Sequence, residues 1–593
     1  MLNRYERAFD ALFLLLIGTL IFAPIPKPIS LEVLGVTGKE FAIYPLGIGM
    51  ILILYVWTRS GKKDILINNS INLESQVFFL KAKWYLEILS LILALSVISG
   101  VLSYPYYEQL LSNSEYLPAR LIHIMEIFHS ENISKAGIGI WLIFKGLKNV
   151  FFDMFWLFGG SFLIYLWYRN RPTRCFEILI QGIFCSLGII FLYELIELPY
   201  LLGSQMAERL LTMINPYIHQ IGQLNNYYIG TTNAAVQAYA WWPPLLWKHQ
   251  VRSVFPEPSF FGMYCAFAVP WLWFVWFQIK KGGLLSLKGL AMALAMTYLY
   301  FLLFATQART AIILFLGELV LLVSYGIYRR DKEILKRMIV ILFLIFIAFS
   351  GSILFTQIER GGIGVFAGAV NSNFKAKDNA ESLAKKGGEN NGCLNGSPNK
   401  VKNGAESLVQ KAGKSYISEN ITSAVGKDKR SNRARFSLME AELKVWMAHP
   451  VLGVGKGLKA AYIPEKLPSD ATKSSEVRMW IDRLHANGPL RATFPDVSEY
   501  TSKLCEIGLL GCLFYYFPVA YLAYFFALFL WRSRGNRQYL KIQNLLFFYL
   551  ISLAGILVGG ISTSLNVNYC FGVLLGIGFI LHHQVKKLKF TKN

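Results

Sequence analysis

Long apolar runs separated by short polar segments dominate this 593-residue chain. Each run is close to the roughly 20 residues that a helix needs to cross the hydrocarbon core of a bilayer. The pattern therefore predicts an all-α polytopic membrane protein with about twelve transmembrane helices. We place these helices at residues 8–25, 41–57, 85–103, 150–168, 176–197, 259–279, 286–304, 310–328, 338–355, 508–531, 542–562 and 568–583.

Lysine and arginine residues gather in every second connection between the apolar runs and near both ends of the chain. Positive residues favour the cytoplasmic side of a membrane protein, so both termini are expected in the cytoplasm. The remaining connections are then expected on the outer side. They are residues 26–40, 104–149, 198–258, 305–309, 356–507 and 563–567.

This threading divides the chain into five regions. Residues 1–197 hold the first five transmembrane helices, 198–258 form an outer loop with an amphipathic helix, 259–355 hold helices six to nine, 356–507 form a large outer loop, and 508–593 hold helices ten to twelve. Within the large loop, residues 371–430 are rich in Gly, Asn, Ser and Lys and are predicted to be disordered.

Two outer segments show apolar residues at helical spacing. In the first, the pattern from Leu202 to Ile218 predicts an amphipathic helix on the membrane surface, and the tryptophans at 241, 242 and 247 are expected to act as interfacial anchors. In the second, Phe436, Leu443 and their neighbours predict a helix over 432–448 that ends before a proline.

Composition agrees with a membrane protein, since 54% of the residues are hydrophobic and only 16% are charged. The net charge of +23 arises largely in the connections between spans, so it does not indicate a nucleic-acid partner. The seven cysteines are scattered without metal-ligand spacing. We therefore expect no metal site, no disulfide framework and no cofactor.

The first candidate site is the segment from Arg252 to Gly262, which precedes a long apolar run. Pro256 and Pro258 exclude a helix through the segment, and Pro258 suits the first turn of the helix that follows. Arg252 and Glu257 would then lie where a transmembrane helix begins, and a helix N-terminus favours an anion such as phosphate. The alternative is an ordinary charged cap between a membrane span and water.

Two further helices are predicted to begin at the same membrane face. One starts at Arg309, and the other follows Asp496, Glu499 and Glu506. Two arginines at this face would bind a diphosphate, because a guanidinium group bonds phosphate oxygens through paired N–H donors. Glu257 or Asp496 would accept a proton from an attacking sugar hydroxyl, so these two are the candidate catalytic residues. The alternative for Arg309 is an interfacial anchor that extends towards water.

Four residues complete the candidate set as substrate-binding positions. Gly453 and Gly455 lie in a glycine-rich turn, where main-chain N–H groups approach a ligand closely, although such a turn also simply ends a helix. Arg435 lies in the helix predicted over 432–448, and Glu499 precedes the tenth span.

Four short motifs resemble those of O-antigen ligase and polymerase proteins and occur in the same order. They are Arg252 to Gly262, Ala308-Arg309-Thr310, His449-Pro450 with Gly453 and Gly455, and the stretch from Glu506 to Gly511. The resemblance implies a GT-C-like fold in the bacterial cytoplasmic membrane. It also implies metal-independent, inverting transfer of a polyprenyl-diphosphate-linked oligosaccharide to an acceptor glycan, with membrane lipid and a chain-length regulator as further partners. The family's diphosphate-binding arginines would correspond to Arg252 and Arg309.

One position departs from the family pattern. Ligases carry a histidine about nine residues before the glutamate of the last motif, and this chain has Val497 there, beside Asp496 and Ser498. The departure favours a polymerase that joins lipid-linked repeat units into an O-antigen or exopolysaccharide. The alternatives are a ligase that transfers glycan to lipid A core or protein, and a transporter of lipid-linked sugar.

Overall fold

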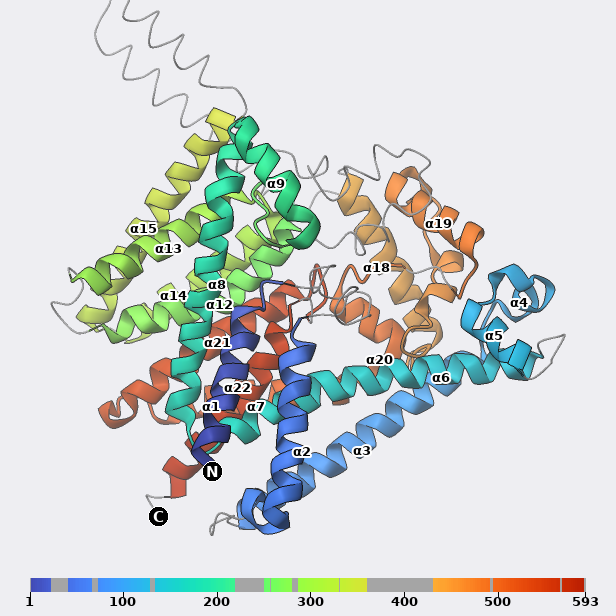
Figure 1. Ribbon diagram of the computed structural model, residues 1–593, viewed down its shortest axis with the longest axis horizontal. Helices are drawn as coiled ribbons and strands as arrows, with labels where there is room; N and C mark the ends of the chain where they lie inside the picture. The colour runs from blue at the N-terminus through green and yellow to red at the C-terminus, as the bar shows by residue number, and fades with distance from the viewer. Residues whose placement is uncertain are drawn as a thin grey trace, which may run out of the picture.

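The computed structural model is helical, with no strand in the residues that it describes (Figure 1). These are residues 2–22, 41–66, 73–127, 134–218, 250–255, 257–279, 286–329, 331–359, 430–490, 494–565 and 568–590. The tryptophans at 241, 242 and 247 and the segment 371–429 lie outside them. The all-α polytopic architecture predicted from the sequence is confirmed.

Nine helices in the described part of the chain are long and apolar enough to cross a membrane. They are α3 (Leu73–Leu102), the continuous helix from α6 (Lys135–Asp153) through η3 (Met154–Gly159) to α7 (Gly160–Tyr168), α8 (Pro172–Leu201), α12 (Pro258–Gln278), α13 (Leu287–Ala305), α14 (Arg309–Arg329), α15 (Lys332–Gln357), α20 (Glu499–Arg532) and α21 (Leu540–Gly559). The helices α1 (Leu2–Gly18), α2 (Ile43–Leu66) and α22 (Cys570–Phe590) overlap the remaining predicted spans.

Several of the long helices begin earlier than the hydrophobic pattern predicts. The helices predicted from residues 85, 150 and 508 begin at Leu73, Lys135 and Glu499. First-turn residues of the latter two helices contact other parts of the protein: Lys135 lies over the ring of Tyr107 (5.1 Å to its centroid), and Glu499 accepts from the hydroxyl of Ser564 (3.0 Å). Protein contacts thus extend a helix beyond the apolar run that predicts it.

The helix α12 forms the centre of the bundle. Trp271, Trp273 and most of its other side chains are buried, and it packs mainly against α21 and α14. At the crossing with α14, a Cβ atom on Gly262 would lie 2.4 Å from that of Ala311, so only glycine permits this approach. Small residues at helix crossings are typical of membrane bundles.

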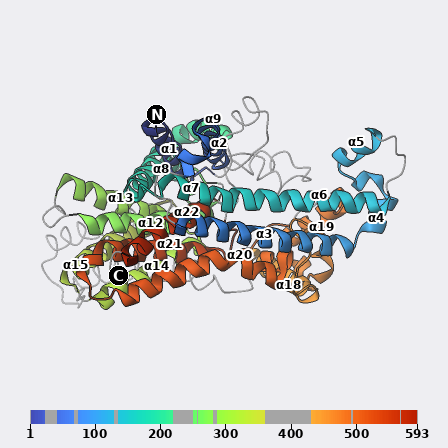
Figure 2. The same cartoon turned by 90° about the horizontal axis from the view of Figure 1, so that it is seen from below.

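The α18–α19 module, residues 430–490, lies beside the bundle. It contains α18 (Arg430–Ala448), α19 (Ser475–Asn487) and the short turns η8 (Lys459–Ala461), η9 (Pro464–Lys466) and η10 (Ala471–Lys473). Leu438, Val477 and Trp480 belong to a small apolar core of its own. In Figures 1 and 2 the helices α3, α6 and α20 extend from the bundle towards this module and towards α4 (Tyr107–Ser112) and α5 (Ala119–Ile127).

The helix α9 (Gln205–Ile218) lies within the segment for which the sequence predicts an amphipathic helix, and α18 covers the segment predicted at 432–448. Met206, Leu210 and Met213 of α9 are exposed, as expected for a helix that rests on a membrane.

Candidate functional site

The N-terminal ends of α12, α14 and α20 meet around the connection between α21 and α22. The main-chain N–H of Glu499 donates to the carbonyl of Gly560 (2.8 Å), and the hydroxyl groups of Thr310 and Ser562 lie 3.2 Å apart. Asn568 donates to the carbonyl of Phe260 (3.3 Å). Three helix N-termini with partial positive charge thus share one end of the bundle, where they favour an anion.

Two arginines gather at this end. Nη1 of Arg309, the first residue of α14, donates to Oδ1 of Asn432 in α18 (3.1 Å). Nη1 of Arg435, one turn further along α18, donates to the carbonyl of Ser562 (3.2 Å). Both side chains are half-buried, and their charges interact with each other. Two neighbouring guanidinium groups repel each other, and an anion bound between them would relieve that repulsion.

Arg252 lies near the same end but inside the protein, with none of its surface exposed. Glu197 of α8 accepts from the main-chain N–H groups of Ser253 (2.7 Å) and Arg252 (3.3 Å), and the phenol of Tyr193 bonds the guanidinium. Burial lowers the pKa of Arg252, while Tyr193 and Glu197 act against this shift. The N–H of Val251 donates to the carbonyl of Ala305 (3.2 Å), which places the turn beside the junction of α13 and α14.

Glu257 is the N-cap residue of α12 but makes no side-chain bond to the N–H groups of that helix. Its carboxylate is half-buried and accepts from the hydroxyl of Ser259 (3.2 Å). The crossing at Gly262 and Ala311 keeps the starts of α12 and α14 adjacent, so Glu257 and Arg309 lie at neighbouring helix ends.

Asp496 has a different environment. Oδ1 accepts from the ammonium of Lys459 and from the hydroxyl of Ser502 (2.9 Å), although 47% of the side chain is exposed. Partial burial acts to raise the pKa of Asp496, but Lys459 and Lys456 outweigh it and hold the pKa below its usual range. A carboxylate with a lowered pKa is a poor general base near neutral pH.

Asp496 belongs to one of two neighbouring ion-pair clusters that the sequence patterns did not predict. In the first cluster Lys459 also bonds Glu442 (2.7 Å). In the second, Lys456 lies 3.1 Å from both Asp153 and Glu506, and Lys503 lies 3.4 Å from Asp153 and 3.8 Å from Glu499. A signal was available, because residues 499, 503 and 506 fall on one face of a helix just before an apolar run. Together the two clusters connect α6, α18, the glycine-rich turn and α20.

The glycine-rich turn bonds to the protein through its own main chain. The N–H groups of Val454 and Gly455 donate to the carbonyls of Cys505 (2.9 Å) and Glu506 (2.7 Å), and that of Gly453 donates to the carbonyl of His449 (3.0 Å). Gly453 and Gly455 have φ of +68° and +91°, which glycine adopts without strain. Since their N–H groups are bonded within the protein, the geometry supports a structural role for both.

Glu499 also holds protein structure together. Its carboxylate is 4% exposed and accepts from the hydroxyl of Ser564 (3.0 Å) and the N–H of Leu565 (3.3 Å). Through these bonds Glu499 fixes the connection between α21 and α22, to which Arg435 donates.

Together, the membrane-spanning helices and the basic, anion-attracting end of the bundle define a multi-pass membrane protein with a site at one end of its bundle. Residues 290–478 match the family model described as O-Antigen ligase, consistent with the predicted O-antigen ligase and polymerase superfamily. The match includes Arg309, Arg435 and the glycine-rich turn, but not the segment at Arg252 or the motif at Glu506. No curated protein shows significant similarity to the chain. The match supports a membrane enzyme of polysaccharide assembly.

Proposed function

We propose that this protein is a glycosyltransferase that polymerises polyprenyl-diphosphate-linked oligosaccharide units at the outer face of the bacterial cytoplasmic membrane. The main supporting observation is the pairing of Arg309 and Arg435 where the N-termini of α12, α14 and α20 meet. Such an arrangement suits a diphosphate, whose charge both the guanidinium groups and the helix ends attract.

In the proposed reaction, Arg309 and Arg435 bind the diphosphate of the donor lipid. A hydroxyl of the acceptor glycan attacks C1 of the donor sugar, the new C1–O bond forms, and the bond from C1 to the phosphate oxygen breaks with inversion. The lipid diphosphate leaves with the electron pair, and its charge is stabilised by the two arginines. Arg252 contributes positive charge from inside the protein and, with Glu197, holds the turn before α12.

Glu257 is the residue that we propose to accept the proton from the attacking hydroxyl. It lies at the start of α12 beside the start of α14, and its carboxylate bonds Ser259 rather than a cation in the described residues. Asp496, the other candidate, is bonded to Lys459 and has a lowered pKa, so it is the weaker base.

The test is an assay of purified protein with a lipid-linked repeat unit as substrate. Arg309→Ala and Arg435→Ala should each lower kcat/KM about 10- to 100-fold, because each removes a charge-assisted bond worth roughly 1.5–3 kcal/mol. Lys444→Ala is the matched control on α18, since Lys444 forms an exposed pair with Glu440 (2.8 Å). Undiminished long-chain product from the Arg309 and Arg435 variants would reject the proposal.

Arg252→Ala should behave differently in the same assay. Removing a buried charge leaves Glu197 without its compensation, which costs about 3–5 kcal/mol of stability. We therefore expect less folded protein and a lower unfolding temperature, whereas Arg309→Ala should unfold like the wild type.

A ligase of the same superfamily is the second candidate, favoured by the description of the matching family model. The residue pattern favours the polymerase, since Val497 occupies the position of the ligase histidine and is buried. The accumulated substrate separates the two functions in cells. An inactive ligase leaves long chains on the lipid carrier, and an inactive polymerase leaves single repeat units.

A further inference from the structure

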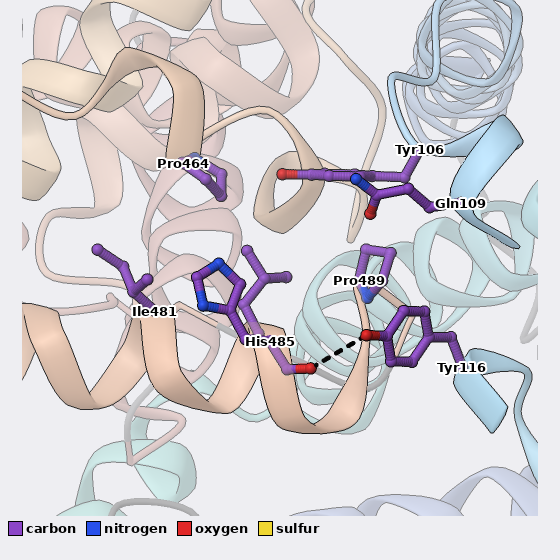
Figure 3. Close-up of a pocket in the computed structure, with 8 residues that line it drawn as sticks. Tyr106, Gln109, Tyr116, Pro464, Ile481, His485 and Pro489 are labelled. Carbon is purple, nitrogen blue, oxygen red and sulfur yellow. Dashed lines mark hydrogen bonds between the residues drawn. The ribbon is translucent and has the colours of Figure 1, made fainter. Parts of the chain in front are cut away.

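A cavity of about 290 Å³ lies between the region of α4 and the α18–α19 module (Figure 3). Tyr106, Gln109 and Tyr116 line it from the α4 side. The α18–α19 module forms the opposite side. It contributes Pro464, Ile481, Leu484, His485 and Pro489. Small-molecule sites occupy about 300–1,000 Å³, so this cavity suits a ligand at the small end of that range.

The lining combines flat apolar surfaces with hydrogen-bonding groups. The rings of Tyr106 and Tyr116 and the apolar side chains of Ile481 and Leu484 offer packing surface, while Gln109 and His485 supply polar groups. Among the described residues that line the cavity, none is an aspartate, glutamate, lysine or arginine. A sugar ring has apolar C–H faces and a rim of hydroxyl groups, so this lining suits a neutral sugar better than a phosphate.

Several contacts fix the shape of the cavity. The hydroxyl of Tyr116 donates to the carbonyl of His485 (3.3 Å), as Figure 3 shows. Gly488, with φ of +75°, ends α19 against the ring of Tyr116, and a Cβ atom there would lie 2.6 Å from that side chain. Tyr104 packs edge-on against both Tyr106 and Tyr462, with ring centroids 6.4 Å and 6.5 Å apart. The cavity is therefore preformed.

The cavity is separate from the arginine pair. Arg309, Arg435 and their partners Asn432 and Ser562 are not among the residues that line it. A group bound in the cavity would thus not be the sugar that reacts at the diphosphate. It would be a part of the same glycan further along the chain, or a separate molecule.

We propose that this cavity is a sugar-binding subsite that holds neutral residues of the glycan remote from the reacting end. The proposal rests on the proposed function, because it takes the ligand to be a part of that enzyme's oligosaccharide. Tyr106 and Tyr116 pack against the faces of the sugar, and Gln109 and His485 bond its hydroxyl groups.

The test measures binding separately from catalysis. The probe is the lipid-free repeat-unit oligosaccharide, released by mild acid from the lipid-linked pool, and the readout is saturation-transfer NMR with the purified full-length protein. Binding should be lost in Ile481→Trp, which fills the cavity, and weakened about five- to tenfold in Gln109→Leu, which removes one hydrogen-bonding group. Asp482→Ala, an exposed neighbour that does not line the cavity, should bind like the wild type.

Catalysis provides a second readout. Gln109→Leu should raise the KM for the lipid-linked unit about five- to tenfold and leave kcat nearly unchanged, because the cavity does not touch the reacting atoms. The subsite is rejected if the oligosaccharide does not bind the wild type, or if it binds Ile481→Trp equally well. Binding that persists in a fully active Arg309→Ala variant would reject the proposed function while supporting the subsite.

Discussion

At the scale of single residues, the same side chain has different roles according to its surroundings. Arg309 and Arg435 are half-buried at helix ends, whereas Arg252 is enclosed and its turn is bonded to Glu197. The sequence could single out Arg309 because it stands between two apolar runs. It could not show that Arg252 is enclosed, because Glu197 lies 55 positions away at the end of another span.

The ion pair of Asp496 leads to a prediction about pH. Its pKa is lower in the folded protein than in the unfolded chain, so ionised Asp496 stabilises the fold above the unfolded value of about 3.9. This stabilisation is lost as the pH falls through the folded pKa. We therefore expect Asp496→Asn to unfold at a lower temperature than the wild type above about pH 4, with the difference shrinking in more acidic buffer.

Thermal unfolding of the detergent-solubilised protein between pH 7 and pH 3 measures this difference. Asp482→Asn serves as the control, because Asp482 is exposed on α19. A gap between wild type and Asp496→Asn that stays constant down to pH 3 would contradict the assigned ion pair.

At the scale of elements, the glycine-rich motif that begins at His449 and the motif from Glu506 to Gly511 form one unit, although they are separate in the sequence. The helix α20 is interrupted at Gly508, where φ is +64° and ψ is −176°. The freed N–H groups of Leu509 and Leu510 donate to the carbonyls of Pro450 (2.9 Å) and Val451 (3.1 Å). Each motif was visible in the sequence. Their pairing was not, because hydrophobic periodicity carries no information about contacts between distant segments.

Gly508→Ala tests this unit. A Cβ atom at this position would lie 2.3 Å from the carbonyl oxygen of Val451, and the positive φ adds strain for any residue with a side chain. We expect a loss of about 1–3 kcal/mol in stability, measured by thermal unfolding, together with reduced activity.

The matched control is Gly317→Ala in α14, where the added methyl group meets no atom within 4 Å. That change should be neutral or stabilising by about 0.4–1 kcal/mol, since alanine restricts the unfolded chain. Equal unfolding temperatures for the two variants would argue against a strained junction at Gly508.

At the scale of the whole molecule, the sequence predicted the spans well because each crossing requires a long apolar run. Every predicted span overlaps a helix, although the ends of several differ. The α18–α19 module was predicted only in part, since the 3₁₀ turns and α19 have weak apolar patterns and are held by tertiary contacts such as Trp480 packed against Phe494.

The proposed orientation places the α18–α19 module outside the cell and the connection between α20 and α21 inside. Cysteine substitutions at Lys444, whose side chain is 40% exposed, and at Arg537, which is exposed, can distinguish the two sides. A membrane-impermeant maleimide should label Lys444→Cys in intact spheroplasts and Arg537→Cys only after permeabilisation. The unsubstituted protein gives the background from native cysteines, and the reverse labelling would invert the topology.

The main-chain bonds between Pro450–Val451 and Leu509–Leu510 have one more consequence. They attach the α18–α19 module to a membrane span, so its distance from the helix ends of the bundle cannot vary freely. On the proposed function, that constant spacing would act as a ruler. An oligosaccharide long enough to reach from the diphosphate to the tyrosine-lined cavity would gain both sets of contacts, and a shorter one would gain only the first.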